Sequence, residues 1–244
     1  MTERGWGRRA PVAVGAGAAL YLFTTASQVV PALPWLRADI MVSLACGLTL
    51  TALFVDGLLP LRGLGNRLLY VFAAALPAAL LFSYLSWAPA ANLAKVLLAV
   101  ALGLWLVLQI PDVRIIVLIA LIVPVVDAFS VFSSLGPTHT LLATQPQAIN
   151  YFAVLFTWFG YSYREAYSAI GTSDLIFFSL YLGATLAFRL RPRLTLALMT
   201  VSFALTVALA LWNLSALPAL PLLSVGFLLG NADILWRRWR TPRP

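Results

Sequence analysis

Eight apolar runs divide the chain, and short polar or proline-containing breaks separate them. They cover residues 11–30, 40–58, 66–86, 92–110, 114–134, 174–189, 193–212 and 217–236. Most are about 20 residues long, which is the length that an α-helix needs to cross the hydrocarbon core of a bilayer. Prolines 31, 34, 60, 89, 111, 192 and 218 punctuate the breaks, as expected where helices end or begin. The pattern predicts an all-α polytopic transmembrane bundle of about eight spans.

Composition points to the same class. Hydrophobic residues make up 62% of the 244 positions and charged residues only 10%, against about 45–50% and 25% in soluble proteins. Eight spans use up the length, so we expect a single membrane domain over 1–244. Residues 1–110 would form an N-terminal four-helix scaffold. Residues 111–244 would form a second half, which contains the helices of Asp127 and Asp174 and the Pro-Ala-Leu segment at 218–220. The first apolar run is longer than a signal peptide needs, so we interpret it as the first span.

The charges are placed as topology signals. The net charge is +8, but the basic residues lie between apolar runs rather than along one helix face, which argues against nucleic acid as a partner and favours membrane lipids. With the N-terminus inside, 13 of the 16 basic residues fall on the inner side. Only Arg37, Lys95 and Arg164 fall outside. We therefore expect an integral membrane protein of a bacterial-type plasma membrane with both termini cytoplasmic.

One connection, 135–173, is long and contains an apolar aromatic stretch at 148–163. A ninth span there would move the arginines at 189–193 to the outer side. We therefore expect a partly inserted or interfacial segment on the outer face. Its aromatic residues would lie at the level of the lipid headgroups; they are Trp158, Tyr161, Tyr163 and Tyr167.

Two acidic residues lie inside or at the edge of apolar runs. Charged side chains are costly in a bilayer, so Asp127 and Asp174 are candidate functional residues. Counted along a helix, Asp127 lies about 20 Å from Arg114, and Asp174 lies about 22 Å from Arg189. Antiparallel neighbouring helices would bring the two carboxyl groups to one level. Two carboxylates at close range share a proton, which is the arrangement of an aspartic protease.

Each aspartate also has a simpler interpretation. Asp174 opens its run and is placed to cap a helix N-terminus. Asp127 is placed to be the proton or cation site of a transporter. The matched depths favour a pair without excluding either alternative.

Three stretches together resemble the GxGD intramembrane aspartyl proteases, the family of presenilin and signal peptide peptidase. Asp127-Ala128-Phe129-Ser130-Val131-Phe132 resembles the D-x-F-x-V-F of signal peptide peptidases, and the following Gly136-Pro137 is similar to a Gly-Pro of presenilins. Gly171-Thr172-Ser173-Asp174 stands where the family has G-x-G-D. The stretch from Ala216 to Pro221 contains the Pro-Ala-Leu signature. The order and spacing of the three fit a microbial member with a presenilin-like fold.

The resemblance implies a site. Asp127 and Asp174 would be the catalytic pair, and the substrate would lie against Gly171, Leu217, Pro218, Ala219 and Leu220. Pro218 and Pro221 lack amide donors, so we expect irregular backbone there, with exposed carbonyls that could pair with substrate. The two prolines could instead simply start the last helix. Gly171 would let the chain approach Asp174 closely.

The expected function is hydrolysis of peptide bonds within transmembrane segments of membrane proteins or signal peptides. The partners would be those substrates and membrane lipids, without nucleic acid or any cofactor. No metal site is expected, because the only histidine, His139, has no second ligand nearby in sequence.

Two other functions remain open. One is a proton-coupled transporter that uses Asp127, although the chain has no internal repeat of the kind that many transporters show. The other is an inactive relative that binds membrane helices, because Ser173 replaces the second family glycine and Val126 replaces the usual tyrosine.

Overall fold

The structure is a computed structural model that describes residues 4–162, 165–213 and 217–240. Within that part, eight long helices fall on the eight predicted apolar runs. They are α1 (Arg4–Ala26), α2 (Leu36–Leu58), α3 (Leu68–Tyr84), α4 (Ala88–Gln109), α5 (Val113–Phe132), α8 (Thr172–Ala187), α9 (Pro192–Asn213) and α10 (Leu220–Arg240). The prediction of a mostly helical chain is therefore confirmed.

The shorter elements lie mainly in the long connection. They are η1 (Leu59–Arg67), α6 (Pro137–Thr144), η2 (Pro146–Ala148), α7 (Ile149–Phe152), β1 (Ala153–Thr157) and β2 (Tyr167–Gly171). The two strands pair antiparallel, from Ala153 opposite Gly171 to Thr157 opposite Tyr167. This hairpin adds a small β-sheet that the apolar pattern did not predict.

Four helical stretches of the described chain are long and apolar enough to cross a membrane. They are Leu36–Tyr84, Ala88–Gln109, Val113–Leu141 and Pro192–Ala210. The first joins α2, η1 and α3, and the helix Thr172–Ala187 is apolar but shorter. The chain thus has the long apolar helices of a membrane protein, whereas the number of eight spans stays a prediction.

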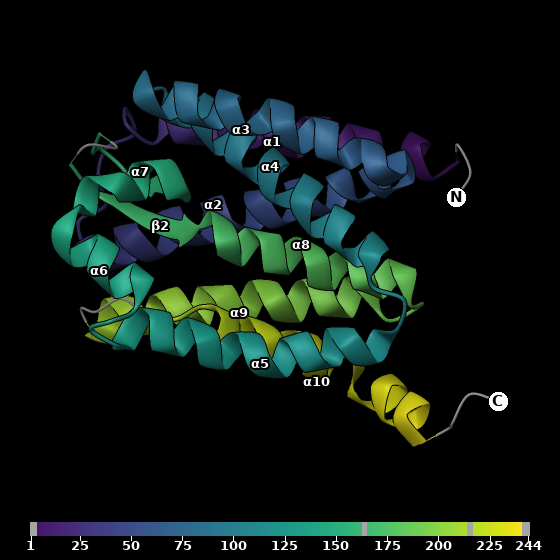
Figure 1. Cartoon of the computed structure of the whole chain (residues 1–244). Helices are drawn as coiled ribbons and strands as arrows, with labels where there is room; N and C mark the ends of the chain where they lie inside the picture. Colours follow the sequence, from purple (N-terminus) through teal and green to yellow (C-terminus); the bar gives the residue numbers. More distant parts are fainter. Residues whose placement is uncertain (1–3, 163–164, 214–216, 241–244) are drawn as a thin grey trace.

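The helices run roughly side by side, and the two ends of the bundle differ (Figure 1). The start of α1 and the end of α10 lie at one end, here called the termini end. The helices α6 and α7 and the β-hairpin lie at the opposite end, here called the hairpin end. Both ends of the described chain therefore share one side of the molecule, the arrangement that the distribution of arginines predicts for the two termini.

Helix α4 passes through the centre and packs closely against α8. Its side chains Val96, Ala99, Val100 and Leu104 are fully buried. At Gly103, the position of a Cβ atom would lie 2.5 Å from the carbonyl oxygen of Ile176 on α8. Small residues let membrane helices approach to backbone contact, so Gly103 fixes the distance between α4 and the helix that carries Asp174.

We predict that Gly103→Ala destabilises the fold, because the added methyl group overlaps the α8 backbone. Overpacking of this kind costs about 1–3 kcal/mol. The matched control is Gly15→Ala, since a Cβ atom at Gly15 on α1 meets nothing within 4 Å. In thermal unfolding of detergent-solubilised protein, Gly103→Ala should lower the Tm and Gly15→Ala should not. Equal melting temperatures for wild type and Gly103→Ala would contradict the close α4–α8 contact.

Candidate active site

Asp127 lies on α5, a helix that is largely uncovered. Its neighbours Val125, Val126 and Phe129 are 69%, 59% and 56% exposed, whereas Asp127 is half-buried. Pro124 lies one turn before it inside the helix and removes one backbone hydrogen bond there. The apolar face of α5 is suited to lipid, and the acid is on the side that faces the protein.

The partner of Asp127 is the start of α10. The Leu220 amide donates to Asp127 Oδ2 at 3.0 Å, across 93 positions of sequence, and the Ala219 amide also interacts with this carboxylate. The first amides of a helix have no acceptor within the helix and carry partial positive charge. A carboxylate from another helix therefore stabilises this helix end, and the helix end in turn stabilises the carboxylate.

The proline-rich segment before α10 adopts the backbone that the sequence predicts. Residues 217–219 are not helical, and Leu220 is the first residue of α10. The carbonyl of Ala219 accepts from the Leu223 amide at 3.1 Å, so the helix ladder begins there. Each interpretation therefore holds for one proline, because Pro218 lies in the irregular stretch whereas Pro221 is the second residue of the last helix. Leu217, Pro218 and Ala219 are half-buried, and Leu220 is buried.

Asp174 is the third residue of α8 and is half-buried. The capping position belongs to Gly171, so the expectation that Asp174 is itself the N-cap is not met. Its carboxylate instead reaches back to the Gly171 amide, which is one half of a capping box. A Cβ atom at Gly171 would lie 3.0 Å from Asp174 Oδ2. The absence of a side chain at Gly171 therefore leaves room for this carboxylate.

The structure brings the predicted site residues together from three helices. The carboxyl groups of Asp127 on α5 and Asp174 on α8 are close enough to interact electrostatically. The start of α10 meets the first of them directly. Two interacting carboxyl groups can share a proton, with one able to accept and the other able to donate. The structure thus places two electrostatically interacting carboxyl groups where α5, α8 and the start of α10 meet.

The residues after Asp127 tie the end of α5 to the following helix. The hydroxyls of Ser130 and Thr138 lie 2.7 Å apart, and the Thr138 amide donates to Ser130 Oγ at 3.2 Å. Gly136 and Pro137 make the turn between the two elements, and Pro137 opens α6. The Gly136-Pro137 motif thus closes α5 at the hairpin end.

The described part of the segment 148–163 contains no membrane-spanning helix, as expected, and its partly inserted or interfacial position stays a prediction. What the sequence did not predict is that part of the segment is a buried strand. All five residues of β1 are buried, including Phe156 and Thr157. Trp158 is half-buried and donates from Nε1 to Ser168 Oγ at 3.1 Å. Tyr163 and Arg164 lie outside the described residues.

Two polar residues of α4 that the sequence did not single out hold the hairpin. Asn92 accepts from the Leu155 amide at 3.0 Å and donates to the Leu155 carbonyl at 2.7 Å. Lys95, expected on the outer side of the membrane, lies at the hairpin end and is buried within the protein. It donates to the carbonyls of Ala153, at 2.8 Å, and Asn150. They satisfy edge groups of β1 that would otherwise be buried without partners. The sequence signal for this role is that two polar residues lie three positions apart, on one face of a largely apolar helix.

A second contact that the sequence did not reveal joins α8 to α10, further along both helices from the two aspartates. The Tyr181 hydroxyl lies 3.0 Å from Ser224 Oγ, and its ring stacks on Phe227 at 4.8 Å. Tyr181 is fully buried. The contact holds the helix of Asp174 and the helix that binds Asp127 in a fixed register.

Comparison with known proteins does not place this chain in a family. A scan against protein-family models finds no match to this chain, and a search of the curated proteins finds none either. The resemblance to GxGD proteases therefore stays a prediction from three short motifs.

We predict that Asn92→Ala loosens the hairpin, because it leaves the amide and carbonyl of Leu155 unpaired. An unsatisfied buried polar group costs about 1–3 kcal/mol. Hydrogen–deuterium exchange of peptides covering 153–157 should accelerate, and the Tm should fall. The control is Asn66→Ala, at an exposed position of η1 at the other end of the bundle. Unchanged exchange in Asn92→Ala would show that β1 does not depend on this side chain.

Proposed function

We propose that the protein is an intramembrane aspartyl protease that hydrolyses peptide bonds within transmembrane segments or signal peptides. The observation that carries the proposal is the meeting of Asp127, Asp174 and the start of α10, three elements far apart in sequence. Two interacting carboxyl groups beside an irregular backbone segment are what such a reaction requires.

The chemistry follows from the pair. With one proton between them, the ionised carboxyl group takes a proton from a water molecule that attacks the peptide carbonyl. The protonated carboxyl group donates a hydrogen bond to the carbonyl oxygen, which stabilises the negative charge that develops there. The proton taken from the water molecule then moves to the amine nitrogen, which departs as the carbon–nitrogen bond of the peptide breaks. Asp127 and Asp174 are the two groups, and they act as one unit.

The surroundings support a substrate that arrives within the membrane. The exposed face of α5 is apolar, so a transmembrane helix can approach Asp127 from the side without crossing a polar surface. Peptide bonds inside a helix are hydrogen-bonded, so the substrate must unwind before it is cut. The non-helical residues 217–219 offer backbone that can pair with such an extended segment.

The test is cleavage of a purified single-span model substrate by the reconstituted protein. Asp127→Asn and Asp174→Asn should each abolish cleavage, and the double variant should be no worse, because groups that act as a unit are non-additive. The matched control is Asp39→Asn, which neutralises another buried carboxyl group, on α2, and should retain activity. Substantial cleavage by either single variant would overturn the assignment to these two residues.

One observation favours a second candidate, an inactive relative that binds membrane helices. Each carboxylate already accepts backbone amides, at Leu220 and at Gly171, and such bonds alone can hold a fold together. In that case wild type cleaves nothing, and both Asp→Asn variants lower the Tm while binding of the model substrate persists. Cleavage by wild type excludes this candidate.

The proposed orientation has its own test. We propose eight spans with the termini end in the cytoplasm, supported by the arginines of that end. Reporter domains fused after Gly136, at the hairpin end, should read outside, and those fused after Arg191 should read inside. Pro244, the last residue, should also read inside, although it lies outside the described residues. An inside reading at Gly136 would overturn the orientation.

A further inference from the structure

A cavity of about 390 Å³ opens at the termini end, away from the two aspartates. Three helix ends form it, namely the start of α5, the end of α8 and the last turns of α10. Its lining consists of Asp112, Val113, Arg114, Ala187, Phe188, Arg189 and Arg238. The volume lies within the range of about 300–1,000 Å³ that is usual for small-ligand pockets.

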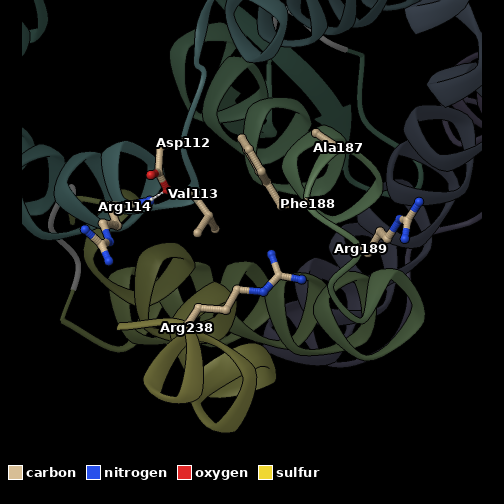
Figure 2. Close-up of a pocket in the computed structure, with 7 residues that line it drawn as sticks. All are labelled: Asp112, Val113, Arg114, Ala187, Phe188, Arg189 and Arg238. Carbon is tan, nitrogen blue, oxygen red and sulfur yellow. Dashed lines mark hydrogen bonds between the residues drawn. The ribbon is translucent and has the colours of Figure 1, made fainter. Parts of the chain in front are cut away.

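The lining is cationic, with three guanidinium groups and one carboxylate. Asp112 is the N-cap of α5, and its carboxylate accepts from the Arg114 amide at 3.0 Å. Arg238 is half-buried, and it forms no ion pair or hydrogen bond with any residue in the described part of the chain. In Figure 2 its guanidinium extends toward the middle of the opening, whereas those of Arg114 and Arg189 flank it and point outward. A half-buried guanidinium group without a partner is suited to bind an anion by charge-assisted hydrogen bonds.

Arg189 adds a second, independent observation. It has a φ of 51°, in the left-handed region that glycine normally occupies just after a helix. The Leu190 amide donates to the Thr185 carbonyl at 2.8 Å, the hydrogen bond that closes such a helix end. A non-glycine residue is strained there, and strained residues gather at functional sites. Here the strained position carries a charge to the rim of the cavity.

We propose that this cavity binds a phosphate-bearing anion, the headgroup of an anionic glycerophospholipid. Guanidinium groups match phosphate oxygens in geometry and charge, and basic pockets between helix ends are suited to such headgroups. The apolar wall of Val113, Ala187 and Phe188 favours a lipid over free phosphate, because a free phosphate gains nothing from apolar contact. The lipid would bridge α5 and α8, which carry the proposed catalytic residues, and α10, whose start binds Asp127.

The test is native mass spectrometry of the full chain in detergent with added phosphatidylglycerol or phosphatidylcholine. Wild type should retain phosphatidylglycerol preferentially, and Arg238→Gln should weaken this binding at least about tenfold. The matched control, Arg67→Gln, removes one exposed charge of η1 at the same end and should change the binding little. Equal binding by wild type and Arg238→Gln would overturn the proposal.

A second variant guards against misfolding. Arg189→Gly removes a charge and relieves the strained backbone, so the Tm should stay level or rise while phosphatidylglycerol binding weakens. Calorimetry with inorganic phosphate separates the two sources of the anion. Weak phosphate binding beside tight phosphatidylglycerol binding supports the lipid, whereas equal affinities would overturn the lipid assignment.

Discussion

The hydrogen bond from the Leu220 amide to the Asp127 carboxylate connects the parts of the structure on which the candidate site depends. It solves two problems at once, because a helix start within an apolar bundle needs acceptors and a carboxyl group there needs donors. It also fixes α5, which has few other buried side chains, against α10. Removal of either partner would leave a polar group without its bond in surroundings that contain little water.

The same requirement explains the hairpin end. Strands β1 and β2 pair with each other, but β1 also has an edge that faces α4. Asn92 and Lys95 complete the hydrogen bonds of that edge. Irregular backbone is tolerated deep in a membrane protein only where protein groups or water satisfy it. The two polar side chains of α4 therefore hold the buried strand β1, whose partner β2 leads directly into the helix of Asp174.

The helices could be predicted from the sequence because their apolar runs are long and are clearly punctuated by proline and arginine. The closeness of Asp127 and Asp174 could be anticipated because helix rise converts sequence distance to depth. The β-hairpin could not be predicted from the sequence. A short apolar run of five residues such as Ala153–Thr157 is equally compatible with a strand and with part of a helix. The roles of Asn92, Lys95 and Tyr181 depend on contacts between distant segments, which periodicity does not encode.

Strand β2 ends at Gly171 and α8 begins at Thr172, so no linker separates the hairpin from the helix of Asp174. The hairpin, anchored on α4, and the first turn of α8 must therefore move as one rigid body. Among the described residues, helix α5 packs mainly against α10 and makes fewer contacts with α8. Because Tyr181 and Ser224 hold the start of α10 to α8, a motion that widens the gap between the two acids has to displace α5 alone and break the hydrogen bond from the Leu220 amide to Asp127.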